Sequence, residues 1–329
     1  MTFPSTYHHQ SVMLSEVIAY LQPHPGKIYV DATLGGGGHT EAILQASSPD
    51  GVVLGIDQDP AALAATQKRL LPYGNRFRSF HGQFADIKKI LTDQGYSSVD
   101  GIIADLGVSS PQIDQAERGF SFQQAGPLDM RMNPHQEETA WTLLKKLSVE
   151  DLTFLLQTYG EERFAKRIAI AINQAFNQVP SSESIEIKPL NTYQLAQLIA
   201  KTIPFHEKGK HPATRTFLAL RMAVNNELGQ LEQFLQQAPH CLSAEGRLVV
   251  LTFHSLEDRL VKQAFRQLKI NGSFELLTTK PISPSMQEVE QNPRSRSVHL
   301  RSILRLPFPK STISNKNNQN SHSLWEGAV

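Results

Sequence analysis

Apolar and polar residues follow a repeating strand and helix pattern along the first third of the chain. Short apolar runs predict strands at 27–31, 52–57, 76–81 and 99–105. Apolar residues three and four positions apart predict helices at 12–21, 40–46, 60–71 and 84–92. Because strands and helices that alternate at this spacing form right-handed βαβ units, we expect a parallel, doubly wound sheet.

The pattern breaks after Asp105, because the next convincing strand runs from Gly246 to Phe253. A crossover between parallel strands needs only a dozen or so residues, so a further unit is inserted here. Its sequence has a helical pattern, in which one helix face is shared by Phe164, Ile168, Ala171 and Ala175. A loop that contains Ser and Pro is expected at 180–189.

The remainder of the chain returns to the sheet. A long helix at 212–238 is followed by a helix at 255–268 and by strands at 274–277 and 300–306, which complete seven strands. We therefore expect an α/β domain made of residues 1–112 and 216–309, an all-α insert at 113–215, and a disordered tail at 310–329, which is rich in Asn and Ser.

The composition excludes several classes of protein. Lys and Arg number 32 and Asp and Glu 31, a net charge of +1, so no bulk attraction points to nucleic acid or membrane. The single Cys241 cannot form an intramolecular disulfide or a multi-cysteine metal site. Apolar stretches of about 18 residues, the H-E-x-x-H pattern and an export signal are all missing. We expect a cytoplasmic protein without a membrane span or a metal site.

Four consecutive glycines, Gly35 to Gly38, follow the first predicted strand. Glycines let a ligand approach the backbone and the next helix offers free N–H groups, so we interpret this turn as a nucleotide or cofactor site. The dinucleotide fingerprint G-x-G-x-x-G does not fit, which disfavours NAD, and the G-K-[ST] of a P-loop is missing. The alternative is a surface turn, but four glycines cost backbone entropy that a plain turn does not need.

Two further positions belong to the same expected site. Asp57 ends the second strand, where an acid in this fold accepts hydrogen bonds from the ribose of NAD or S-adenosylmethionine. Its alternative role is to cap the helix that starts at Pro60, for which Asp59 is better placed. Phe84 follows the third strand and can lie against a purine ring, although spacing alone favours a core position.

The loop from Asp105 to Gln112 follows the fourth strand, at the edge where open sheets bind ligands. Adenosylmethionine-dependent amino-group methylases carry a short acid-to-proline loop at this edge. A cytosine amine is a poor nucleophile, because its lone pair is delocalised into the ring. An acceptor that holds its N–H groups favours attack on a sulfonium methyl, and Asp105 can be that acceptor. Loop capping is the alternative, favoured for Ser109 and Ser110.

Seven ordered segments carry a family resemblance. They are the glycine turn, Gly55–Pro60 (GIDQDP), Asp105–Gln112 (DLGVSSPQ), Glu117–Phe122 (ERGFSF), Gly126–Met132 (GPLDMRM), Phe253–Arg259 (FHSLEDR) and Asn292–Ser297 (NPRSRS). From about His9 to Arg305 the chain resembles the bacterial 16S rRNA (cytosine-N4) methyltransferase family. Two departures occur: the turn has Gly where some members carry Arg, and residues 297–301 read SVHLR where SAKLR is more usual, which removes one positive charge.

The resemblance implies a class I methyltransferase with a Rossmann-like, mostly parallel sheet and an inserted helical domain. It implies action on one cytidine of 16S rRNA, at the decoding centre of the small ribosomal subunit. It also implies S-adenosylmethionine as cofactor, with contacts from Gly37, Gly38, His39, Asp57, Phe84, Asp105 and Gln112. Asp105 is our candidate catalytic residue as well, because it can orient the amine. The oligomeric state is not determined, and a homodimer stays open.

Local clusters of positive charge are the candidates for RNA contact. A segment without acids, 291–312, carries Arg294, Arg296, Arg301, Arg305 and Lys310. A second cluster contains Lys208, Lys210, His211 and Arg215. Candidates for the cleft between the domains are Arg118, Asp129 and Arg131, and His254, directly after the fifth strand, is a candidate to face the acceptor base. The alternatives are solvated charge for the clusters, an Asp129–Arg131 ion pair, a satisfied edge histidine at 254, and a plain helix cap formed by Ser255 with Asp258.

Three other functions remain open from the residues. A DNA cytosine-N4 methylase would use the same chemistry on a different polymer. An assembly factor would bind the cofactor without turnover. An NAD dehydrogenase is disfavoured by the spacing of the glycines.

Overall fold

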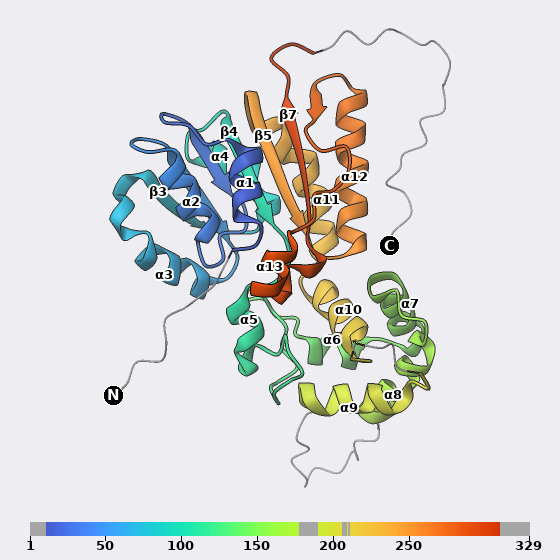
Figure 1. The fold of residues 1–329 in the computed structure, drawn as a ribbon. Helices are drawn as coiled ribbons and strands as arrows, with labels where there is room; N and C mark the ends of the chain where they lie inside the picture. The colour runs from blue at the N-terminus through green and yellow to red at the C-terminus, as the bar shows by residue number, and fades with distance from the viewer. Residues whose placement is uncertain (1–10, 178–189, 206–208, 210, 310–329) are drawn as a thin grey trace, which may run out of the picture.

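A seven-stranded sheet forms the centre of the computed structural model, which describes residues 11–177, 190–205, 209 and 211–309 (Figure 1). The strands are β1 (Ile28–Asp31), β2 (Val52–Asp57), β3 (Phe77–His81), β4 (Val99–Asp105), β5 (Leu242–Thr252), β6 (Phe274–Leu276) and β7 (His299–Arg305). Their order is β3-β2-β1-β4-β5-β7-β6. Neighbours from β3 to β5 are parallel, and β7 is antiparallel to both β5 and β6. The expected mostly parallel sheet is confirmed.

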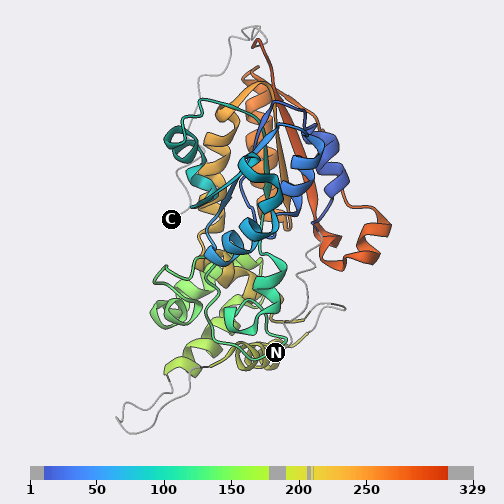
Figure 2. The same cartoon turned by 90° about the vertical axis from the view of Figure 1, so that its left-hand side faces the viewer.

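Helices cover both faces of the sheet (Figures 1 and 2). On one face, α1 (Leu14–Leu21) and α2 (Gly38–Ala46) contribute Val17, Ile43 and Leu44 to a buried cluster. On the other face, α4 (Ile87–Asp93), α11 (Glu227–Gln237) and α12 (Ser255–Ile270) contribute Leu91, Phe234 and Val261. Burial on both faces explains why β2 and β4 are nearly continuous apolar runs rather than alternating ones.

A cluster of helices with its own core lies beyond the carboxyl end of β4 (Figure 1). It contains α6 (Ala140–Lys146), α7 (Val149–Gly160), α8 (Ala165–Asn177), α9 (Thr192–Thr202) and α10 (Thr214–Val224). Its core is apolar and includes Leu143, Leu156, Ile168, Ile199 and Leu220. The chain enters it through α5 (Ser110–Asp114), so this helical region is inserted into the α/β part.

Shorter elements complete the chain. They are α3 (Pro60–Arg69), α13 (Met286–Gln291), and the 3₁₀ helices η1 (Leu71–Arg76), η2 (Phe84–Asp86), η3 (Ala116–Arg118), η4 (Ala238–Cys241) and η5 (Pro293–Ser297).

The single long helix expected at 212–238 is wrong, because the chain forms α10 and α11 with a turn between them. Asn226 adopts a left-handed conformation at φ 47°, which Asn tolerates better than most residues. The turn lets α10 bury its apolar face in the helical cluster while α11 packs on the sheet. The domain boundary expected at residue 215 therefore falls among the contacts of the helical cluster, and we propose that this unit extends to Val224.

Some expectations concern residues that the structure does not describe. The loop expected at 180–189 and the tail expected at 310–329 both lie outside the described ranges. Among the described helices, none has the length and apolar character needed to cross a membrane. Within the same part of the chain, no three His, Cys, Asp or Glu side chains gather as a metal-binding group.

Candidate functional site

A cleft opens at the carboxyl ends of β1, β2 and β4, with an empty volume of about 1200 Å³ that includes open solvent. All seven residues predicted as cofactor contacts line it: Gly37, Gly38, His39, Asp57, Phe84, Asp105 and Gln112. The structure thus brings together residues from four separate segments of the chain.

The glycine turn between β1 and α2 is packed tightly against its surroundings. Gly37 has φ 74°, and a Cβ there would lie 2.6 Å from the Thr66 Cγ2 atom of α3. A Cβ at Gly38 would overlap the Ser11 hydroxyl. Gly36 and Gly37 are buried, which disfavours a plain surface turn, and the positive φ of Gly37 favours glycine there, whereas a Cβ at Gly38 would meet the Ser11 side chain rather than backbone. Since α2 begins at Gly38, its first N–H groups lie at the cleft without acceptors in the helix itself.

Asp57 holds the end of β2 against the glycine turn. Its Oδ2 accepts a hydrogen bond from the Gly35 N–H at 2.7 Å, and its Oδ1 accepts one from the Asp59 N–H at 2.8 Å. Burial raises the pKa of Asp57 to about 6, with the nearby Asp59 and Asp31 adding to the rise. The cap of α3 is Asp59, which accepts from the Ala61 N–H, as the sequence indicated. Asp57 therefore does not act as the helix cap.

Asp105 ends β4 beside His39. Its N–H donates to the Thr33 hydroxyl at 2.6 Å, and its Oδ2 lies 3.7 Å from His39 Nδ1. The other carboxylate oxygen, Oδ1, is buried and has no hydrogen-bond partner among the described residues. Burial raises the pKa of Asp105 to about 6; His39 opposes the rise, whereas Asp31 and Glu257 add to it. An acceptor without a donor is thus held at the cleft.

The His39 ring is oriented so that Nδ1 faces Asp105 and Nε2 faces the backbone of Val12. Its Nε2 lies 2.9 Å from the Val12 carbonyl oxygen, which can only accept a hydrogen bond. Nε2 must therefore carry a proton in this contact, and Nδ1 is the nitrogen that faces the Asp105 carboxylate. The side chain of His39 is buried, so both contacts are shielded from water.

Phe84 and Gln112 also make contacts within the protein. The Phe84 ring packs edge to face on Phe234, with 5.4 Å between centroids, so it serves the core and lines the cleft as well. Gln112 Nε2 donates to Asp59 Oδ2, and Gln112 Oε1 accepts from the Ser109 N–H, each at 3.0 Å. Ser109 is the residue that precedes α5, so the capping role expected for it is confirmed.

His254 is the N-cap of α12, and its Nδ1 accepts from the Glu257 N–H. Its Nε2 lies 3.1 Å from Glu257 Oε1, a charge contact without hydrogen-bond geometry, so Nε2 has no hydrogen-bond partner among the described residues. The cap expected from Ser255 and Asp258 is wrong by one residue, because the chain stays extended through His254. Burial alone would raise the pKa of Glu257, but the contact and charge of His254, with Arg221 and the Phe253 N–H, lower it.

Several of the basic residues that were candidates for RNA contact instead bind groups within the protein. Arg301 is buried and forms a two-pronged pair with Asp258 at 2.7 and 2.9 Å, so its expected phosphate contact is wrong. Arg305 donates to the Leu242 carbonyl oxygen, and Arg294 pairs with Asp114 at 2.6 Å. Arg296 is exposed. The remaining lysines, Lys208, Lys210 and Lys310, lie outside the described residues.

The ion pair between Asp129 and Arg131 forms at 2.7 Å and is local, so the ordinary interpretation of that pair is confirmed. Met132, which follows it, reaches the cleft instead. Two α11 residues, Glu227 and Gln230, line the cleft as well. Sequence reasoning missed all three residues. Glu227 and Gln230 were missed because a single helix through 212–238 hides the turn that directs the start of α11 toward the cleft. The Asn225-Asn226 pair was the available signal.

Two solved structures of other proteins are similar in overall fold. A putative rRNA methylase from Clostridium thermocellum matches with a TM-score of 0.43 and 14% identity, over 89% of this chain and 95% of that chain. The fibrillarin of Aeropyrum pernix, in complex with natively bound S-adenosyl-L-methionine, matches with a TM-score of 0.37 and 10% identity, over 88% and 74%. Neither score reaches 0.5, so membership of a family rests on sequence.

The sequence matches are extensive. Proteins named ribosomal RNA small subunit methyltransferase H are 45% identical in Trichlorobacter lovleyi, over 91% of this chain and 99% of that protein, and 48% identical in Synechococcus sp., over 90% and 91%. The model of the MraW methylase family matches residues 6–306. The chain therefore belongs to the MraW methylase family, and it is a class I methyltransferase with S-adenosylmethionine as its cofactor.

Proposed function

We propose that this chain transfers the methyl group of S-adenosylmethionine to the exocyclic N4 amine of a cytidine in 16S rRNA, at the decoding centre of the small ribosomal subunit. Methylation of small-subunit rRNA is what the names of its relatives state, and these relatives match over about nine-tenths of the chain. The choice of the N4 amine rests on the loop that follows β4. Action on ribosomal subunits would place the protein in the cytoplasm.

The lining of the cleft fits the cofactor, and we propose the seven predicted residues as its contacts. S-adenosylmethionine supplies an electrophilic methyl group on a sulfonium centre. In this proposal Asp57 accepts from the ribose and Phe84 lies beside the purine, and both residues line the cleft. The N–H groups at the start of α2 suit the carboxylate of the amino-acid part. Asp105 lines the same cleft with its negative charge, which suits the positively charged sulfonium centre of the cofactor.

A single observation carries the assignment of the acceptor group. Asp105 lines the cleft, and its buried Oδ1 lacks a donor among the described residues, which is costly unless a ligand that reaches the carboxylate supplies one. An amino group on a pyrimidine has N–H donors of the required kind. When Asp105 accepts from it, the nitrogen lone pair is withdrawn from the ring and directed toward the methyl group. The base must leave its stack to reach this depth.

Asp57→Ala tests the cofactor contacts. We expect the Kd for S-adenosylmethionine to rise roughly 10- to 100-fold, because about 1.5–3 kcal/mol of charged hydrogen bonding to the ribose disappears. Isothermal titration calorimetry measures it. Asp100→Ala is the matched control. Asp100 also accepts from a backbone N–H, that of Ile28, but it lies near the amino end of β4, away from the cleft at the carboxyl end. Equal affinity of Asp57→Ala and wild type would contradict the contact.

Methyl-labelled S-adenosylmethionine distinguishes the proposed substrate from the alternatives. Purified protein receives unmodified small subunits, naked rRNA or duplex DNA in parallel reactions. We expect label in the subunits above all. Label in duplex DNA instead would favour a DNA cytosine methylase, and cofactor binding without label in any substrate would favour an assembly factor.

A further inference from the structure

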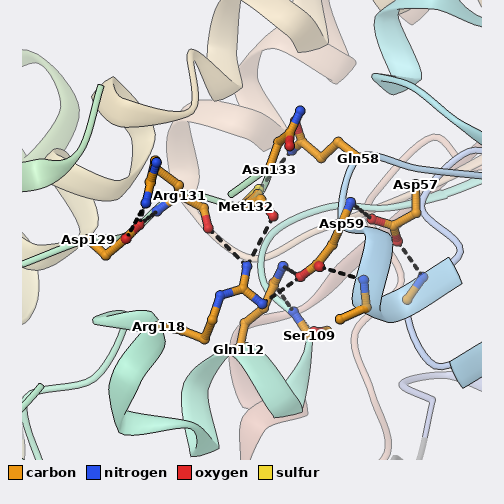
Figure 3. Close-up of polar contacts among 12 residues, drawn as sticks. Asp57, Gln58, Asp59, Ser109, Gln112, Arg118, Asp129, Arg131, Met132 and Asn133 are labelled. Carbon is orange, nitrogen blue, oxygen red and sulfur yellow. Dashed lines mark hydrogen bonds and ion pairs between the residues drawn. The ribbon is translucent and has the colours of Figure 1, made fainter. Parts of the chain in front are cut away.

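Arg118 lies where the chain passes from the α/β part toward the helical cluster, at the end of η3 (Figure 3). Its guanidinium group bridges two segments that are far apart in sequence. Nη1 donates to Asp59 Oδ2 at 2.7 Å, and Nη2 donates to the carbonyl oxygens of Arg131 and Met132, each at 3.0 Å. The Arg118 side chain is 17% exposed and that of Asp59 4%, so water screens this ion pair little.

Asp59 connects Arg118 to the cofactor side of the cleft. Its Oδ1 caps α3, whereas its Oδ2 accepts from both Arg118 and Gln112. Its own N–H donates to Asp57, the proposed ribose acceptor, which in turn holds the glycine turn. An uninterrupted run of hydrogen bonds therefore leads from the glycine turn to Arg118 (Figure 3).

Met132 is the residue at the other end of this connection. It lines the cofactor cleft, and three polar contacts fix it. Arg118 holds its carbonyl oxygen, Asn225 Oδ1 accepts from its N–H at 2.7 Å, and Gln58 Nε2 lies 3.1 Å from its sulfur. Asn225 belongs to the turn between α10 and α11, so the position of Met132 depends on both parts of the molecule.

We propose that Arg118 is a positioning residue, which holds Met132 in the wall of the cofactor cleft and thereby aligns the helical insert with the cofactor side. Arginine suits this role because its planar fork reaches a carboxylate and two carbonyl oxygens at once. Lysine, a single ammonium group on a flexible stem, cannot reproduce all three contacts. The effect that we expect of Arg118 on RNA methylation rests on the proposed function. The effect that we expect on cofactor binding does not.

The test compares Arg118→Lys with Arg301→Lys. Arg301 forms a largely buried, two-pronged pair with Asp258, but both of its elements belong to the α/β part. We expect both variants to melt at lower temperature than wild type. Only Arg118→Lys will weaken S-adenosylmethionine binding, roughly threefold to tenfold by calorimetry. Asp59→Asn should reproduce this loss, because Asn still caps α3 while the charge is removed.

A double-mutant cycle shows whether Arg118 acts through Met132. If it does, Arg118→Lys combined with Met132→Ala will weaken cofactor binding no more than the stronger single change, whereas Arg301→Lys with Met132→Ala will show independent effects. Multiplicative losses for Arg118 and Met132 would overturn the proposal. So would a cofactor affinity of Arg118→Lys equal to that of Arg301→Lys.

Hydrogen exchange provides a readout that needs no RNA. Addition of S-adenosylmethionine to wild type should protect the backbone at 129–133 as well as at 57–62, and in Arg118→Lys the protection at 129–133 should be lost. Protection of 129–133 that persists in Arg118→Lys would overturn the proposal.

With small subunits as substrate, we expect the KM of Arg118→Lys to rise several-fold above that of Arg301→Lys. Absence of methyl transfer by wild type would contradict the proposed function and leave the exchange result valid.

Discussion

Asp105→Asn will lower the single-turnover rate of methyl transfer at saturating S-adenosylmethionine roughly 100-fold or more, while the protein stays folded. The substitution keeps the size of the side chain and removes the negative charge that would hold the amine. Because Asp105 Oδ1 is buried without a donor, no solvent group can take over this role. Single-turnover methylation of small subunits measures the rate, and calorimetry measures cofactor affinity separately.

The wild-type pH profile supplies an independent readout of the same carboxylate. Burial raises the pKa of Asp105 to about 6, so acidification through that pH protonates the acceptor and the rate falls. His39, Asp31 and Glu257 are the charged groups that influence this titration. At saturating S-adenosylmethionine the profile of Asp105→Asn should lack this fall, because Asp57, whose pKa is also raised to about 6, then no longer acts through cofactor affinity. A variant with full turnover, or a wild-type rate that stays level from pH 7 to pH 5, would refute the role of Asp105.

Gly126→Ala will destabilise the protein by roughly 3 kcal/mol. A Cβ at Gly126 would overlap the Ala116 carbonyl oxygen and lie 2.7 Å from its carbonyl carbon, and backbone atoms cannot yield as a flexible side chain can. Any shift also strains two hydrogen bonds, since Gly126 donates to the Thr192 hydroxyl and accepts from the Thr192 N–H. Thermal unfolding followed by circular dichroism should show a midpoint several degrees lower.

Gly95→Ala is the matched control for this prediction. Gly95 has φ 79°, but a Cβ there meets no atom within 4 Å, so only backbone strain of about 1–2 kcal/mol is expected. A midpoint for Gly126→Ala that equals or exceeds that of Gly95→Ala would show that the close approach to Ala116 does not hold the insert in place.

Local sequence signals account for most of the α/β part. Three of the predicted strands end at turns that the sequence marks clearly. These turns are the glycines after β1, the Asp57–Pro60 segment after β2 and the Asp105 loop after β4. Since parallel strands share a carboxyl edge, strand ends imply a common site. The seven residues proposed from the family resemblance accordingly meet in one cleft.

Contacts between segments that are distant in sequence could not be predicted from local patterns. The pair between Asp59 and Arg118 depends on how the helical insert returns to the sheet, which no local period encodes. The turn at Asn226 was not predicted because the apolar spacing on its two sides matches a single helix. In the structure the apolar face of α10 is buried in the helical cluster and that of α11 against the sheet. Arg301 likewise looked like a surface charge until its partner Asp258, on another element, was placed beside it.

Nucleoside mass spectrometry of the product tests the central claim most directly. Unmodified small subunits are incubated with the protein and methyl-labelled S-adenosylmethionine, and their 16S rRNA is then digested to nucleosides. The chemistry of the Asp105 loop predicts that the label appears as N4-methylcytidine. Label found instead in a ring-carbon or ribose methyl group, with no N4-methylcytidine, would contradict it.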